Sequence, residues 1–151
     1  MALGTGRLEH EDKWIGVMMT NFIPSIKVSL YISGDELNFE KVTRKIGVVP
    51  TRTRTKDSFP PQALACNLWS VDIKEENCWG VSVVIEKVLE IFKGKESIIN
   101  EVCTDYNLET SIEIVIHVQD GDSPEVVLPR EVISFASMIN AEIGFDLYCF
   151  E

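Results

Sequence analysis

The sequence predicts an α+β fold in which helices pack on one or both faces of a mainly antiparallel sheet. Some segments place an apolar residue at every second position, which is the period of a strand with one buried face. Between them lie segments whose apolar residues recur at steps of three and four, as on one side of a helix. The expected order is β-α-β-β-α-α-β-β-α-β, and its first part repeats the β-α-β-β-α-β order of a ferredoxin-like unit.

The clearest passage from strand to helix lies near the start of the patterned sequence. SIKVSLYIS, residues 25–33, alternates apolar and polar residues and predicts a strand. Residues 35–46 predict a short helix, with Asp35 as its N-cap and Gly47 at its end. Threonine and arginine then alternate over residues 51–55, which predicts an exposed or edge strand.

The middle of the chain predicts a loop, a strand and two helices. Residues 56–65 contain two consecutive prolines and are expected to form the loop. CNLWSVDI, residues 66–73, predicts the strand. Apolar residues at helical spacing then predict one helix over residues 78–93 and a second over residues 97–106, with a glycine between them.

The last third begins with the most regular strand pattern of the chain. TSIEIVIHV, residues 110–118, sets isoleucine and valine on one face and polar residues on the other. Residues 119–124 predict a turn and residues 125–128 a short strand. A helix is expected over residues 129–140, opened by a proline, and a final strand over residues 144–150.

The first 22 residues show neither period and are expected to be an N-terminal extension. All strand and helix patterns fall within residues 23–151, which are expected to form one domain. A chain of 151 residues is long enough to bury a core of its own. We therefore expect residues 25–150 to fold without the extension.

The composition and the net charge indicate which kinds of molecule this protein is expected to bind. The chain is 45% hydrophobic and 25% charged, as in ordinary globular proteins, and its net charge is −10. That charge repels phosphate backbones and anionic lipids, so neither nucleic acid nor membrane is an expected partner, whereas a basic protein is. No apolar run reaches the 18 residues of a membrane-spanning helix. We expect a cytoplasmic protein whose oligomeric state the sequence leaves open.

The residues that usually carry chemistry are few and widely spaced. Two histidines, with no paired Cys-x-x-Cys spacing, give little material for a metal site or a histidine-based catalytic pair. The sequence also lacks the common phosphate-binding and nucleophile motifs. We expect no catalytic residue, no metal and no cofactor. The four cysteines are expected to be reduced and mostly buried; they are Cys66, Cys78, Cys103 and Cys149.

One segment departs from the acidic character of the chain. Residues 41–56 contain six of the fourteen basic residues and no acid. One interpretation is an anion-binding site, for which the candidate residues are Arg44, Arg52, Arg54 and Lys56. The other, which we prefer, is that these cations protect an edge strand from pairing with another chain and balance a helix dipole. No aromatic residue alternates with the charges, so a stacking site for single-stranded nucleic acid is not indicated.

Two tryptophans complete the set of candidates. Trp69 and Trp79 are expected to belong to the core. A half-exposed tryptophan would instead suit a binding surface, and for that reason Trp69 is retained as a candidate ligand-binding residue.

Several short motifs, taken in their order and spacing, resemble those of the bacterial domain of unknown function 4279 (DUF4279). They are Ser33-Gly34-Asp35 with Leu37, Ile46-Gly47-Val48 with Pro50-Thr51, Trp69, Leu128-Pro129 and Asp146-Leu147-Tyr148. The likeness covers about residues 25–150. It implies a small bacterial cytoplasmic protein and supplies no activity, because the family has none assigned.

Two functional hypotheses follow. The first is a non-enzymatic protein-interaction module, such as an immunity protein that neutralises a toxin by covering its basic active site. It rests on the acidic charge, the small size and the lack of catalytic motifs. The alternative is a regulator that binds a small molecule or anion through the basic patch at residues 41–56.

Overall fold

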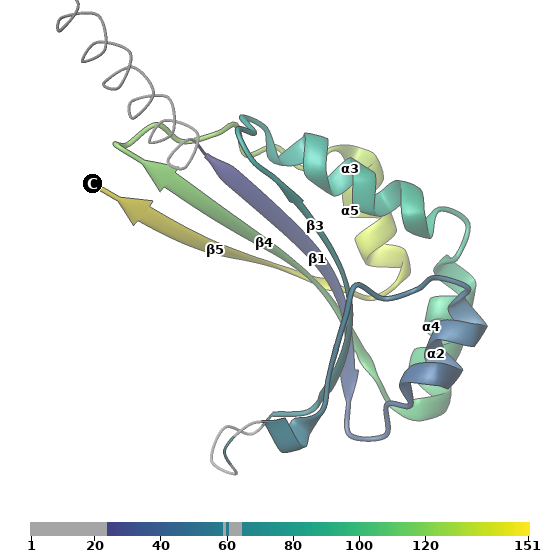
Figure 1. The fold of residues 1–151 in the computed structure, drawn as a ribbon. Helices are drawn as coiled ribbons and strands as arrows, with labels where there is room; N and C mark the ends of the chain where they lie inside the picture. Colours follow the sequence, from purple (N-terminus) through teal and green to yellow (C-terminus); the bar gives the residue numbers. More distant parts are fainter. Residues whose placement is uncertain (1–23, 59, 61–64) are drawn as a thin grey trace, which may run out of the picture.

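The structure, a computed structural model, describes residues 24–58, 60 and 65–151 (Figure 1). The expected extension over residues 1–22 lies outside the described residues. Five strands form one sheet in the order β2-β3-β1-β4-β5. The strands are β1 (Ser25–Gly34), β2 (Arg52–Arg54), β3 (Asn67–Glu75), β4 (Glu109–Gln119) and β5 (Glu142–Phe150).

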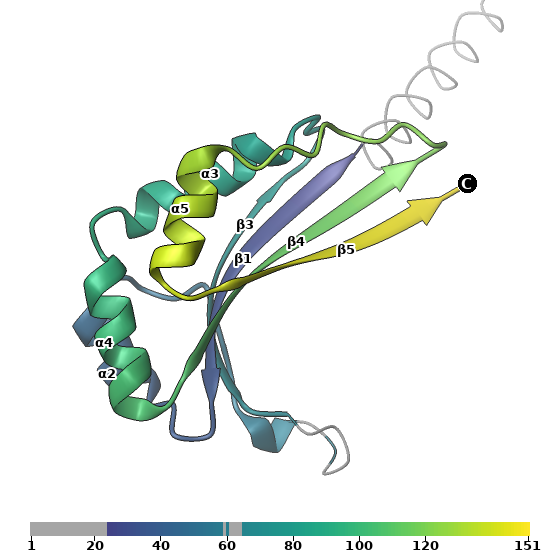
Figure 2. The same cartoon turned by 180° about the vertical axis from the view of Figure 1, so that it is seen from behind.

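All four described α-helices lie on one face of this sheet, as the two opposite views show (Figures 1 and 2). The helices are α2 (Phe39–Ile46), α3 (Val81–Phe92), α4 (Glu96–Tyr106) and α5 (Arg130–Met138). The predicted α+β class and the mainly antiparallel sheet are therefore confirmed, with one helical layer and not two.

The first four strands have the ferredoxin-like arrangement that the sequence predicts. β1 lies between β3 and β4 and is antiparallel to both, while β2 is antiparallel to β3 at one edge. The chain then adds α5 and β5, and β5 lies parallel to β4 at the other edge. A parallel neighbour needs a crossover connection, and α5 supplies it.

The core lies between the sheet and the helices. On β1, Ile26, Val28, Leu30 and Ile32 are fully buried, and α3 covers this layer with a stripe of valines, Ile85 and Phe92. Trp69 of β3 is also fully buried, and its ring meets that of Phe92 edge to face, with centroids 6.3 Å apart. Its indole N–H donates to the Thr43 hydroxyl at 3.0 Å, so the polar atom of this buried ring has a partner.

The other face of the sheet, which we call the open face, has no helix of the described chain on it (Figure 2). Here β1 alternates to small and polar side chains, among them Ser29 and Tyr31. Ser29 is fully buried, although no described helix lies over this face.

Helix α2 begins later than predicted. Asp35 lies in the turn after β1, and the N-cap is Asn38, whose side-chain oxygen accepts from the Lys41 amide at 3.0 Å. The extended backbone of Asn38 suits that role. The predicted end is correct, because Gly47 has a φ of 75° and its amide donates to Thr43.

The predicted strand over residues 125–128 is wrong. Only Glu125 pairs, through an isolated bridge to Gly80, where its amide donates to the Trp79 carbonyl at 2.8 Å. The turn before it bends as expected, with positive φ at Asp120 and Gly121, but the chain then leaves the sheet and crosses to the start of α3. Val126 and its neighbour therefore remain exposed.

Two expectations about burial are also wrong. Trp79 is 53% exposed, because it precedes α3 at the margin of the helical layer and not within it. Of the four cysteines only Cys78 is buried; Cys66 and Cys103 are half-buried, and Cys149 on the outer strand is exposed. All four are free thiols. None of the helices in the described ranges has the length and apolar character of a membrane span.

Gly34 provides a test of the packing at the end of β1. A Cβ added there would lie 2.6 Å from Cδ2 of buried Leu108 and 3.2 Å from the Asn107 carbonyl oxygen. We expect Gly34→Ala to lower the free energy of unfolding by about 1–3 kcal/mol through overpacking. The matched control is Gly144→Ala on β5, where a Cβ meets no atom within 4 Å. Urea denaturation of both variants checks this, and an equal effect of the two would contradict it.

Candidate functional site

The structure separates the residues of the predicted basic site. Arg44 lies in the last turn of α2, in the helical layer. Arg52 and Arg54 lie on β2, which is an edge strand as predicted, and strand alternation directs both toward the open face. Lys56 follows in a short 3-10 helix, Lys56–Ser58, where its ammonium group lies 3.6 Å from the Asp35 carboxylate.

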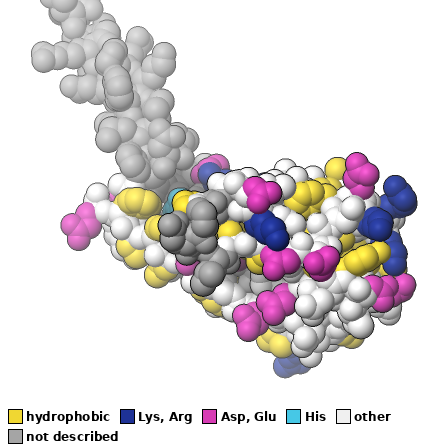
Figure 3. All heavy atoms as spheres, turned by 90° about the horizontal axis from the view of Figure 1, so that it is seen from below, with side chains coloured by type: hydrophobic (Ala, Val, Ile, Leu, Met, Phe, Trp, Pro, Cys, Tyr) yellow, Lys and Arg dark blue, Asp and Glu magenta, His cyan; other side chains and the backbone are white. Residues whose placement is uncertain are grey.

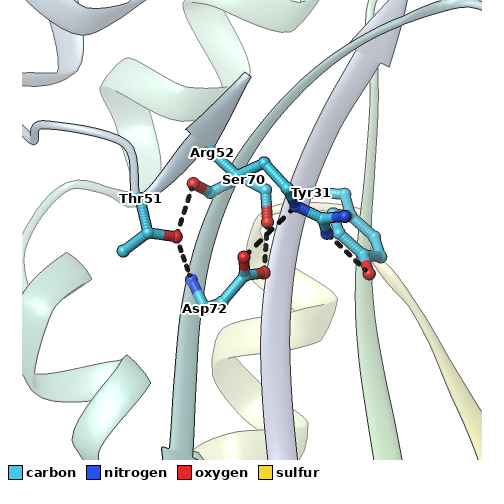
Figure 4. Close-up of polar contacts among 5 residues, drawn as sticks. All are labelled: Tyr31, Thr51, Arg52, Ser70 and Asp72. Atoms are coloured by element: carbon cyan, nitrogen blue, oxygen red, sulfur yellow. Dashed lines mark hydrogen bonds and ion pairs between the residues drawn. The ribbon is translucent and has the colours of Figure 1, made fainter. Parts of the chain in front are cut away.

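Arg52 is held by contacts within the protein (Figure 4). Its Nη2 atom donates to the Tyr31 hydroxyl at 3.4 Å, and the guanidinium carbon lies 5.7 Å from the centre of the Tyr31 ring. Its Nε atom lies 3.3 Å from Oδ2 of Asp72, as an ion pair. Arg52 of β2 therefore contacts side chains from two further strands of the sheet, β3 and β1.

Asp72 is the anion at the centre of these contacts. The Ser70 hydroxyl donates to it at 2.6 Å, and its own amide donates to the Thr51 hydroxyl at 2.8 Å (Figure 4). Burial alone would raise the pKa of this carboxyl, but the hydroxyls of Ser29 and Ser70 and the charge of Arg52 outweigh burial and lower it. Asp72 therefore stays ionised and keeps Arg52 in place.

Other cations of the basic segment are also paired. Lys45 lies 3.5 Å from Asp105 and 3.9 Å from Glu101, and it sits 5.6 Å from the centre of the Tyr106 ring. Together with Arg52 and Lys56, three of the six cations face carboxylates of the same chain. Seen from below, acidic side chains lie close to the basic ones over this end of the molecule (Figure 3). At least half of the cations in this run are therefore paired with carboxylates in the fold.

Trp69, the remaining candidate, belongs to the core. Its ring is fully buried and its N–H is satisfied by Thr43. The structure therefore gives this side chain a packing role between β3 and the helices.

Sequence reasoning missed a row of polar side chains across the open face. We call it the polar belt; its members are Arg52, Asp72, Ser29, Tyr31, Glu113 and Asp146. Contact with the Asp146 carboxyl, reinforced by burial, raises the pKa of Glu113. The signal in the sequence was the polar face of the regular strand, where Glu113 alternates with isoleucines. Its partner on β5 could not be seen without the strand order.

The polar belt offers little enclosed space. The hollow beside it, between β4 and β5, has a volume of about 210 Å³ and is lined in part by Glu113, Gly144 and Asp146. Ligand pockets of ordinary size begin at about 300 Å³. The belt is therefore better suited to fixing the strands than to enclosing a small molecule.

The helical layer contains a larger hollow, between α3 and α5, which we call the acidic groove. Its volume is about 530 Å³. Leu89, Phe135 and Met138 are its apolar lining residues, and one cation, Lys93, also lines it. Its acidic lining residues are Glu86, Glu90, Glu96 and Glu131.

A third hollow, of about 580 Å³, lies where α4 and β4 meet, and two of its polar side chains are engaged in hydrogen bonds within the chain. The Thr110 hydroxyl donates to the Ile139 carbonyl at 2.8 Å, and the Asn100 amide donates to the Met138 carbonyl at 2.6 Å. Burial raises the pKa of the Cys103 thiol, which disfavours a reactive thiolate there. Within the described ranges, no three histidine, cysteine or acidic residues are grouped so as to hold a metal ion.

Comparison with known proteins places the chain in a family. A family model described as "Domain of unknown function (DUF4279)" matches residues 24–150. That range includes every described strand and helix, and it confirms the resemblance carried by the sequence motifs. Comparison with curated proteins and with solved structures gives no match.

The ion pair of Asp72 leads to a pH-dependent prediction. Its lowered pKa contributes stability that is present above the unfolded-state pKa of about 3.9 and is lost as the pH falls through the folded-state value. We expect Asp72→Asn to cost about 1–2 kcal/mol at pH 7, because Arg52 loses its counter-ion. The cost should shrink at pH 3. Urea denaturation at both pH values measures it against exposed Asp57→Asn, and a cost independent of pH would contradict the assignment.

Glu113 leads to a prediction of opposite sign. A carboxyl with a raised folded-state pKa contributes stability below its unfolded-state pKa, and this contribution is lost as the pH rises through the folded value. Glu113→Gln removes one of two carboxyls that repel each other when ionised, so at pH 7 it should raise the melting temperature by about 1–2 °C. Below about pH 4 the gain should vanish. Calorimetry with Glu109→Gln, from the same strand, is the control; a gain shared by both variants would argue against the pair.

Proposed function

Since the chain belongs to the DUF4279 family, a domain of unknown function, we propose a role from its own surface: it is a protein-interaction module that binds a basic protein partner in the acidic groove. The single observation that supports this is that one groove is lined by both apolar side chains and four carboxylates. The apolar side chains favour burial against a partner, and the carboxylates select a partner of opposite charge.

The carboxylates of the groove are available to pair with the cations of a partner. Within the described residues, Glu86, Glu90, Glu96 and Glu131 have no ion-pair partner. Asp72, Asp35 and Asp105, in contrast, are matched to cations of the basic segment. The unbalanced part of the net charge of −10 therefore includes this groove.

The shape of the groove suits a helix or a loop with basic residues beside an apolar anchor. Two neighbouring helices leave a channel into which a third can pack, and its cations would then lie against the glutamates. Attraction between the charges would speed association and make it sensitive to salt. An immunity protein that covers the basic active site of a toxin is one form that such a module takes.

The alternative function, an anion-binding regulator that uses residues 41–56, has weaker support. The pairing of Arg52 with Asp72 and of Lys56 with Asp35 means that an anion would compete with carboxylates already in place. A micromolar affinity for inorganic phosphate that is lost in Arg52→Ala would favour the regulator over the groove.

A defined peptide tests the proposed function. We expect an amphipathic helical peptide of leucine and lysine to bind the protein, with an affinity that falls as salt rises. Replacing Glu86, Glu90 and Glu131 by glutamine should weaken binding about tenfold, since three exposed ion pairs contribute roughly 0.5 kcal/mol each. Fluorescence anisotropy at two salt concentrations measures this.

The matched control changes the same charge elsewhere. Glutamine at Glu36, Glu40 and Glu125, all exposed and away from the groove, should leave the affinity within about twofold. If both triple variants weaken binding equally, the peptide responds to net charge alone and the groove is not its site. A native partner recovered by affinity capture should be basic and should be lost with the groove variant only.

A further inference from the structure

The two edges of the sheet are built differently. The β2 edge is three residues long and carries two arginines, features that discourage pairing with another strand. The β5 edge is nine residues long, and its charged residues within the strand are Glu142 and Asp146. It contains no lysine, arginine or proline.

The β5 strand also exposes more large apolar side chains than any other described element. Phe145, Leu147, Tyr148 and Phe150 are 48%, 60%, 49% and 50% exposed. Phe145 and Leu147 lie on the helical face of the strand. Tyr148 and Phe150 lie on the open face, where both rings contact His117 edge to face, and all four side chains remain about half exposed. Exposed apolar area concentrated on a free edge indicates an interaction surface.

The backbone at this edge is oriented for strand pairing. The Phe150 carbonyl accepts from the Asp120 amide at 3.0 Å, on the side of β4. Because N–H and C=O groups alternate sides along a strand, even-numbered residues of β5 direct theirs toward β4. The odd-numbered residues, including Phe145 and Leu147, direct theirs to the outer edge, where the described chain has no further strand.

We propose that β5 pairs antiparallel with β5 of a second copy of this chain, across a two-fold axis at Leu147. The two sheets then form one continuous sheet of ten strands, with both helical layers on the same side. A second copy fits because an antiparallel pair of identical strands is self-complementary under two-fold symmetry.

Side-chain chemistry selects this register. An axis at Asp146 would set two carboxylates directly opposite each other, which is unfavourable. An axis at Phe145 would leave Phe150 outside the paired segment. With the axis at Leu147, residues 144–150 pair throughout: Leu147 meets its copy, Phe145 meets Cys149, and Asp146 meets the Tyr148 hydroxyl.

The same register fills a gap. Gly144 has no atom within 4 Å of the position where a Cβ would lie, and Phe150 of the second copy comes to lie opposite it. An aromatic ring over a strand glycine covers its exposed backbone. The vacant position and the exposed ring are therefore complementary.

The contact is the size of a weak, specific interface. Since a large apolar side chain has roughly 200 Å² to bury, the four half-exposed ones supply on the order of 800 Å² over two copies. With the paired backbones the total approaches about 1,000 Å², which corresponds to a reversible dimer. Each copy carries a charge of −10, so salt should strengthen the dimer by screening repulsion.

Cysteine cross-linking in the full chain tests the register. Leu147→Cys in a Cys149→Ser background should oxidise to a covalent dimer, because residues opposite each other in a hydrogen-bonded pair have Cα atoms about 5.5 Å apart. Phe145→Cys should cross-link when Cys149 is retained and should fail to do so with Cys149→Ser. Cross-linking of the Phe145→Cys, Cys149→Ser chain, or of the Cys149→Ser parent, would overturn the register.

Light scattering tests the dimer itself. The unmodified chain should associate as concentration and salt rise, and Leu147→Lys should raise the dissociation constant at least tenfold. Val49→Lys, at an exposed position away from β5, should leave it unchanged. A full chain that stays monomeric at high concentration and high salt overturns the proposal. Because the acidic groove lies elsewhere, Leu147→Lys should still bind the basic peptide, so the two proposals fail separately.

Discussion

The alternation of β1 between two kinds of side chain is the constraint on which the rest of the structure depends. This strand lies at the centre of the sheet and fixes the registers of β3 and β4 at once. Its isoleucines, valine and leucine enter the core, while serines and Tyr31 occupy the open face. A slip of one residue would exchange the two sets, bury the polar belt and expose the core. The helical layer and the polar belt are thus two results of one pattern.

The order of charges along the chain differs from their order in space. Arg52 belongs to the most basic run of the sequence, yet in the fold it is held by Asp72 and Tyr31, which come from two other strands. The glutamates of the acidic groove are scattered over α3, α4 and α5, and no run of the sequence marks them. The local excess of positive charge in the sequence is therefore partly balanced where strands meet. Negative charges that are spread along the sequence come together where helices meet.

Periodicity was enough to predict most of the fold, because burial of one face is a local property of a strand or helix. It predicted β1, β4 and α3 well. It failed at the start of α2, because the N-cap residue Asn38, and not the apolar period, sets where that helix begins. Residues 125–128 have strand-like composition but find no ladder partner. The sites were harder to predict, since the contacts of Arg52 and Glu113 depend on strand order. Tertiary arrangement, and not residue type, decides which charges are available.

Strands β1 to β4 form the antiparallel part of the sheet by themselves, and α5 and β5 extend it at one edge. The first four strands close the ferredoxin-like arrangement, and the later residues supply one wall of the acidic groove and the whole of the outer edge. Because ribosomal synthesis runs from the N-terminus, the antiparallel strands emerge before residues 130–150 do. Both proposed recognition surfaces are consequently completed last, after the central strands have had the opportunity to pair, so a nascent chain lacks either complete surface until residues 130–150 have emerged.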